Sequence, residues 1–156
     1  MMIEIGKPAP LFSLYNTEKQ LVSLESLRGK NVLIHFFPMA FTGVCTAQLC
    51  NARDNMEIYT KLHCTVLGIS VDSLFTLGVY KKQENYSFDL LSDFNKTTIQ
   101  DYGLYYPDFV FGMKGVSNRA AVLIDKEGIV RYFEVTPTIG DQPNYNAITD
   151  ALAKLA

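Results

Sequence analysis

Two cysteines in one short stretch are the residues of this chain best suited to do chemistry. Cys45 and Cys50 lie five residues apart, and an apolar run that ends at Pro38 precedes them. Cys45 falls where a helix is predicted to begin. A thiol in the first helical turn faces unpaired backbone N–H groups and the positive end of the helix dipole, and both favour the thiolate. The stretch therefore predicts a redox-active nucleophile.

Each residue around Cys45 has a structural interpretation beside the chemical one. Cys45 could be a small buried hydrophobe, although its place beyond the end of a strand is typical of ligand sites in α/β sheets. Thr42 could cap the helix or donate a hydrogen bond to a thiolate or a substrate oxygen. Pro38 could end the strand or cover the thiol. Gln48 could be an exposed helix residue or orient polar groups near the sulfur.

The other candidate ligands and nucleophiles are few. Cys64 opens a predicted buried strand and is interpreted as a core thiol, with a second resolving cysteine or a metal contact as the alternatives. His35 lies inside an apolar strand and is interpreted as a core histidine with its hydrogen bonds made. One cysteine beside one histidine, His63, does not make a metal-ligand set. We therefore expect neither a metal nor a cofactor.

Composition bounds the class of protein. The chain has 156 residues, of which 48% are hydrophobic and 19% charged, with a net charge of −2. This size predicts a single domain, residues 1–156. The charge balance argues against nucleic acid or an anionic membrane as a partner, because both need a basic face. Three cysteines and no visible secretory signal predict a cytoplasmic protein, and no apolar run approaches the ~18 residues of a membrane helix.

Hydrophobic patterning predicts the elements that position the cysteines. We expect a hairpin from residues 11–14 and 20–23, strands at 31–37, 64–71, 88–91, 119–124 and 129–135, and helices at 44–62, 72–85, 96–102 and from 141–143 to near the end. Residues 104–118 are expected to be irregular. Strands that alternate with helices pair in parallel, and a late hairpin adds antiparallel strands. The prediction is an α/β fold with a mixed central sheet and helices on both faces.

The stretch from Phe36 to Cys45 resembles the peroxiredoxin active-site signature, Pro-x-x-x-Thr/Ser-x-x-Cys. Residues 27–37, 66–72 and 117–125 resemble the segments that flank it in that family, in the same order. The resemblance implies a thioredoxin-like fold and thiol-dependent reduction of peroxides. It identifies Cys45 with the peroxidatic cysteine and Pro38, Thr42 and Arg119 with its catalytic partners.

Cys50 has two interpretations within this resemblance. Its spacing resembles the bacterioferritin-comigratory (Q-type) peroxiredoxins, in which a cysteine at this place resolves the sulfenic acid. Helical residues five apart have Cα atoms about 8.6 Å apart, beyond the ~7 Å limit for a disulfide, so the helix would have to unwind. The loop before Cys45 instead resembles the alkyl hydroperoxide reductase E branch, in which an external thiol can resolve.

The function predicted is a peroxidase acting on hydrogen peroxide or an organic hydroperoxide. Its reductant would be a thioredoxin-like protein or a low-molecular-weight thiol, and the chain would be a monomer or a homodimer. The alternative is a redox sensor or partner-binding module that uses Cys45 without turnover. A general disulfide oxidoreductase is disfavoured by the lack of C-x-x-C, and a Cys-His hydrolase by the lack of an orienting partner for either histidine.

Overall fold

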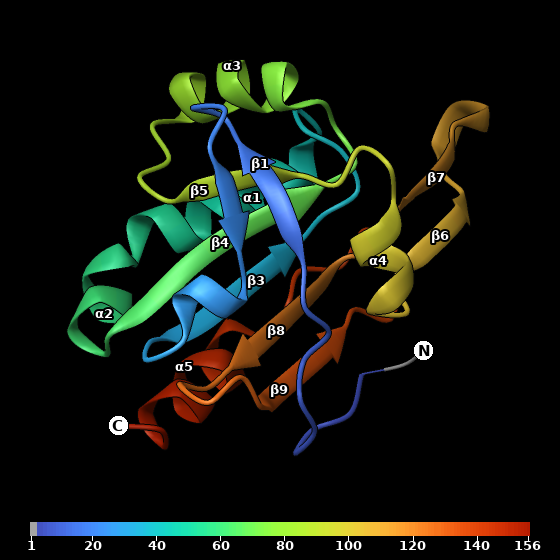
Figure 1. Ribbon diagram of the computed structural model, residues 1–156. Coiled ribbons are helices and arrows are strands. Elements are labelled where there is room, and N and C mark those ends of the chain that lie inside the picture. Colours follow the sequence, from blue (N-terminus) through green and yellow to red (C-terminus); the bar gives the residue numbers. More distant parts are fainter. Residues whose placement is uncertain (1–2) are drawn as a thin grey trace.

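A seven-stranded mixed sheet forms the centre of the computed structural model, which describes residues 3–156 (Figure 1). Across the sheet the strands are β2 (Leu21–Ser23), β1 (Ser13–Asn16), β5 (Asp89–Ser92), β4 (Cys64–Ser70), β3 (Asn31–Phe36), β8 (Ala120–Ile124) and β9 (Val130–Val135). The pairs β3–β4 and β4–β5 are parallel, and the remaining pairs are antiparallel. The predicted mixed sheet and N-terminal hairpin are confirmed.

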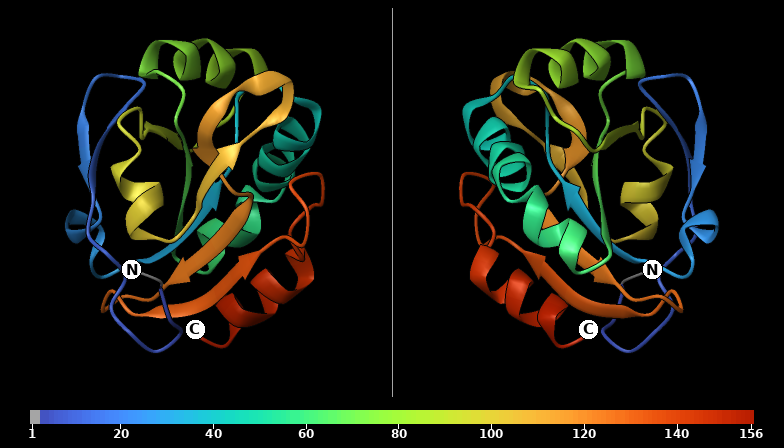
Figure 2. Two further views of the ribbon diagram at one scale, coloured as in Figure 1. Left: turned by 90° about the vertical axis from the view of Figure 1, so that its right-hand side faces the viewer. Right: turned by 90° about the vertical axis from the view of Figure 1, so that its left-hand side faces the viewer.

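Helices cover both faces of the sheet, as predicted (Figure 2). On one face lie four helices that pack in the same core as Cys45: α1 (Gly43–Asp54), α2 (Met56–Lys61), α3 (Leu74–Glu84) and α5 (Tyr145–Ala153). On the other face lie α4 (Thr97–Asp101), the short 3-10 helix η1 (Glu25–Leu27) and the N-terminal segment. Among residues 3–156, no helix has the length and apolar character needed to cross a membrane.

Strand β3 lies inside the sheet between β4 and β8, and all six of its residues are buried. Side chains alternate between the two faces of a strand. Val32 and Ile34 therefore pack in one core, whereas Leu33 packs in the other, beneath α1 and α5. By the same alternation His35 points toward α1. A strand covered on both faces needs mostly apolar side chains, which explains the nearly continuous apolar run that predicted it.

The predicted helix 44–62 is divided in two at Asn55. This residue has φ −114° and ψ 16°, and its side chain donates to the carbonyl of Asn51 at 2.7 Å. Asparagine competes with the helical backbone through such local bonds, which accounts for the break. On α2, Glu57 and Lys61 form an ion pair one helical turn apart, with the charged atoms 3.7 Å apart.

The region predicted to be irregular, residues 104–118, instead forms a two-stranded ribbon that projects from the domain (Figure 1). It consists of β6 (Tyr105–Asp108), the 3-10 turn η2 (Val110–Gly112) and β7 (Lys114–Ser117). The final helix begins at Tyr145 rather than at 141–143, because the Asn144 side chain caps it by accepting from the N–H of Ala147.

Candidate active site

Cys45 is the third residue of α1, at the end of a short loop that leaves β3. The loop passes through Pro38, which is buried, and Phe41, which has a left-handed φ of 66°. The N–H of Ala40 donates to the carboxylate of Asp72 at 2.8 Å, which ties the loop to the segment after β4. The predicted helix start is confirmed, and it presents the free N–H groups of the first turn around the thiol.

Arg119, directly before β8, reaches the sulfur of Cys45 from the strand next to β3. Its Nη2 donates to Cys45 Sγ at 3.3 Å, and the two side chains are 3% and 0% exposed. Two further bonds hold the guanidinium, from Nε to the carbonyl of Ile139 and from Nη1 to Gln48 Oε1, both 2.9 Å. A buried cation held in this orientation stabilises negative charge on the sulfur.

The pairing of β3 with β8 explains why Arg119 lies there. The two strands are antiparallel, and Phe36, the last residue of β3, pairs with Ala120, the first residue of β8. Arg119 therefore stands beside the point where β3 leads into the Cys45 loop. Two segments far apart in the sequence thus form one site.

Thr42 occupies the N-cap position of α1, but its side chain makes neither of the contacts considered from the sequence. It forms no capping hydrogen bond, and its Oγ1 donates to the carbonyl of Met39 at 2.9 Å. The hydroxyl thus stabilises the loop in this structure. Its catalytic role stays a prediction.

Cys50 lies on the same helix as Cys45 but faces other neighbours. It is half-buried, and its sulfur lies 3.7 Å from the hydroxyl of Tyr86 and 3.8 Å from Glu84 Oε2. Helix α1 runs unbroken between the two cysteines, and both are free thiols. In this conformation the two sulfurs cannot bond.

Sequence reasoning underestimated three supporting residues. Gln48 is fully buried and contacts Arg119, which agrees with the second of its two interpretations. His35 is buried as predicted, but its Nε2 has no hydrogen-bond partner among the described residues, so the expectation of a fully bonded histidine is wrong. From the sequence, either Asp72 or Ser73 could cap the helix predicted at 72–85; Ser73 caps α3, and Asp72 instead binds the active-site loop. The signal for Asp72 was its place directly after a buried strand.

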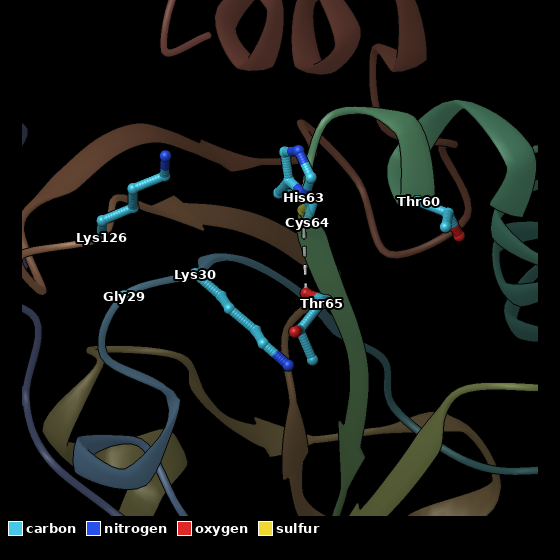
Figure 3. Close-up of a pocket in the computed structure, with 7 residues that line it drawn as sticks. All are labelled: Gly29, Lys30, Thr60, His63, Cys64, Thr65 and Lys126. Atoms are coloured by element: carbon cyan, nitrogen blue, oxygen red, sulfur yellow. Dashed lines mark hydrogen bonds between the residues drawn. The ribbon is translucent and has the colours of Figure 1, made fainter.

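Cys64 begins β4, at the opposite end of the sheet from the Cys45 loop. Figure 3 shows Cys64 between His63 and Thr65, among the residues that line a depression there. Cys64 pairs with Asn31 at the beginning of β3, whereas Cys45 follows the end of that strand. Its thiol borders an open depression of ≈ 550 Å³ and contacts the carbonyl of Thr65 at 3.7 Å. Burial raises the pKa of Cys64 to about 12. These features fit the core-thiol interpretation.

Comparison with known proteins agrees with this geometry. The model of the AhpC/TSA family matches residues 5–133. Alkyl hydroperoxide reductase E of Mycobacterium tuberculosis is 36% identical over 157 residues, covering 99% of each chain. The chain belongs to the AhpC/TSA family, the peroxiredoxins. A putative peroxiredoxin bcp of Coxiella burnetii is 39% identical over 132 residues, which are 83% of this peroxiredoxin and 87% of the relative.

A solved structure supports the fold of this peroxiredoxin. The crystal structure of peroxidoxin BcpB from Mycobacterium tuberculosis superposes with a TM-score of 0.87 at 20% identity and covers 99% of both chains. The thioredoxin-like fold is thereby confirmed. Family membership makes this peroxiredoxin an enzyme, a thiol-dependent peroxidase.

Proposed function

We propose that Cys45 is the peroxidatic nucleophile of this enzyme and that it reduces hydrogen peroxide or an organic hydroperoxide. The observation that carries the proposal is the contact between Arg119 Nη2 and Cys45 Sγ, 3.3 Å long and buried. A cation with several fixed donors suits both a thiolate and the peroxide oxygens that it attacks. The apolar wall around the thiol excludes competing nucleophiles.

In the first step the Cys45 thiolate attacks one peroxide oxygen, and the O–O bond breaks. The sulfur becomes a sulfenic acid, and the other oxygen leaves as water or an alcohol after taking up a proton. Arg119 stabilises the charge that moves from sulfur to oxygen. We propose that Thr42, after rotating away from the Met39 carbonyl, donates to a substrate oxygen, and that Pro38 shields the sulfur.

In the second step Cys50 condenses with the sulfenic acid and releases water to form a disulfide. This step requires the first turns of α1 to unwind, because helical residues five apart are about 8.6 Å apart at Cα. Unwinding would break the contact between Cys45 and Arg119 and the 2.9 Å hydrogen bond between Thr46 Oγ1 and the Tyr80 hydroxyl. A thioredoxin-like dithiol would then reduce the disulfide by thiol exchange.

The alternative for the second step is an external low-molecular-weight thiol, as the loop before Cys45 implied. The mass of the protein after one equivalent of peroxide separates the two. A loss of two hydrogen atoms with a disulfide-linked peptide pair containing Cys45 and Cys50 supports internal resolution. A stable added oxygen overturns it and supports the external thiol.

The matched experiment uses three serine variants under stopped-flow turnover with hydrogen peroxide and a dithiol reductant. Cys45→Ser should lose all turnover, and Cys50→Ser should stop at the sulfenic acid. Cys64→Ser should behave as the wild type, because this thiol lies at the far end of β3. Retained turnover in Cys45→Ser would refute the proposal, and consumption of a single equivalent by the wild type would favour the redox sensor.

We further propose that residues 1–156 act as a single domain in the cytoplasm, as a monomer or a homodimer. Met1 and Met2 lie outside the described residues. The two cores share one sheet, which supports a single domain. The low cysteine count supports a cytoplasmic location.

A further inference from the structure

Behind Arg119 a row of buried polar side chains leads to His35. Gln48 Oε1 accepts from Arg119 Nη1 at 2.9 Å, and Gln48 Nε2 lies 3.0 Å from His35 Nδ1. Gln48 and His35 are both fully buried. The three residues come from α1, β3 and the segment before β8, so they connect three elements beneath the nucleophile.

The donors and acceptors determine the direction of this row. Arginine is only a donor, so the oxygen of the Gln48 amide must face Arg119. The amide nitrogen then faces His35, and the carbonyls of Phe36 and Ala120, 3.4 and 3.5 Å from it, also accept there. His35 Nδ1 must therefore accept, and the ring carries its proton on Nε2.

His35 holds this position at a cost. Its Nε2 has no partner among the groups of residues 3–156, and a buried unpartnered donor costs about 1–3 kcal/mol. Burial lowers the pKa of His35 to about 4, so the ring is neutral near pH 7 and Nδ1 is free to accept. An apolar side chain would pack in β3 without this cost but would leave the Gln48 amide without its shortest acceptor.

We propose that His35 is a positioning residue of the peroxidatic site. Its Nδ1 fixes the Gln48 amide, and the amide in turn holds the Arg119 guanidinium on the Cys45 sulfur. The inference rests on the proposed role of Cys45. Without an acceptor at position 35, the Gln48 nitrogen keeps only its two longer contacts, to the carbonyls of Phe36 and Ala120. The side chain can then shift toward those carbonyls and draw its oxygen away from Arg119, which displaces the guanidinium.

Two variants separate the hydrogen bond from the packing. In His35→Asn, the side-chain oxygen can take the place of Nδ1 and accept from Gln48. In His35→Leu, the volume is kept and the acceptor is lost. We expect His35→Leu to lower the second-order rate constant for hydrogen peroxide by up to about 10²-fold, the effect of a misplacement of ~1 Å. His35→Asn should retain most of the rate and of the Cys45 thiolate fraction at fixed pH.

An unchanged rate in His35→Leu, or equal losses in both variants, would overturn the inference. The same measurements distinguish a failure of this inference from a failure of the proposed function of Cys45. If the wild type reacts, Cys45→Ser does not, and His35→Leu matches the wild type, then only the role of His35 is refuted.

A second measurement needs no turnover and no substitution at His35. Nitrogen NMR of the labelled wild type should show a neutral imidazole with its proton on Nε2. An Nδ1–H ring or a doubly protonated ring in the wild type near pH 7 would refute the proposed row, because Nδ1 could not then accept from Gln48.

Discussion

Arg119 donates a hydrogen bond to the Cys45 sulfur across 3.3 Å, although 74 positions separate the two residues in the chain. The pairing of Phe36 with Ala120 brings them together, since it sets the start of β8 beside the end of β3. The bonds to Ile139 and Gln48 then fix the plane of the guanidinium. Strand pairing thus sets the place of the donor, and Gln48 of α1 and the Ile139 carbonyl beyond β9 set its orientation.

Replacing Arg119 tests how much this donor contributes. We expect Arg119→Met to lower the rate constant for hydrogen peroxide by about 10²–10³, the usual effect of losing one such donor. Arg119→Lys should fall between this variant and the wild type, because lysine keeps the charge but cannot form the three directed bonds. Stopped-flow measurement of the first oxidation step gives the values. The matched control is Arg28→Met, an exposed arginine. A wild-type rate in Arg119→Met would contradict the assignment.

The hydrogen bond between Thr46 and Tyr80 joins the first turns of α1 to α3, at 2.9 Å. Such a bond contributes about 1 kcal/mol net, so Thr46→Val should raise the unwound population of α1 about fivefold. Formation of the Cys45–Cys50 disulfide after a peroxide pulse should accelerate by the same factor. Tyr80→Phe removes the other partner of the bond and should accelerate disulfide formation in the same way. Thr60→Val, at an exposed position of α2, is the control and should leave the rate unchanged. An unchanged rate of disulfide formation in both variants would show that unwinding does not limit this step.

The central strands and the nucleophile could be predicted from the sequence because their signals are local. The run that forms β3 is apolar on both faces, and the signature around Cys45 is contiguous. The break at Asn55 escaped prediction, since it depends on a side-chain bond to Asn51 that competes with a continuous apolar stripe. The ribbon of β6 and β7 was missed because its turn contains left-handed Phe111 and Gly112 rather than a two-residue hairpin turn.

The support of the site was harder to predict, because it depends on strand register. The contacts of His35 require knowing that α1 covers the face of β3 to which this side chain points. Gln48 is equally consistent with an exposed or a buried face of a helix until that packing is known. Resemblance to the family identified Arg119, but its hydrogen bonds to Gln48 and Ile139 follow only from the three-dimensional arrangement.

Asp72 provides a test of how the active-site loop is held. Its Oδ2 accepts from the N–H of Ala40 at 2.8 Å and from Ser70 Oγ at 2.6 Å, and burial raises its pKa. Asp72→Ala leaves these donors without an acceptor, so we expect a loss of about 1–3 kcal/mol in the free energy of unfolding. Asp72→Asn keeps one acceptor and should lose less.

Urea unfolding measures both Asp72 variants, and the peroxide rate reports whether the loop has moved. Asp150→Ala, at an exposed position of α5, is the control. Equal stability of Asp72→Ala and the wild type would mean that the loop does not depend on this carboxylate.

The buried His35 makes stability depend on pH in a defined window. Burial lowers its pKa from 6.5 to about 4, so between these values the unfolded chain binds a proton that the folded protein excludes. Stability must therefore fall as the pH falls through this window. From about pH 7 to about pH 4.5, we expect His35 to cost the wild type about 2–3 kcal/mol of unfolding free energy.

The buried carboxyls of Asp72 and Asp93 act in the opposite sense, because burial raises their pKa and the folded state takes up protons first. Their contribution is common to the wild type and His35→Asn, so the difference between the two proteins isolates the histidine. Asparagine at position 35 does not titrate. The unfolding free energy of His35→Asn, relative to that of the wild type, should therefore rise by about 2–3 kcal/mol from about pH 7 to about pH 4.5. Urea unfolding at both pH values measures the gap, and a gap independent of pH would show that His35 takes up its proton equally in both states.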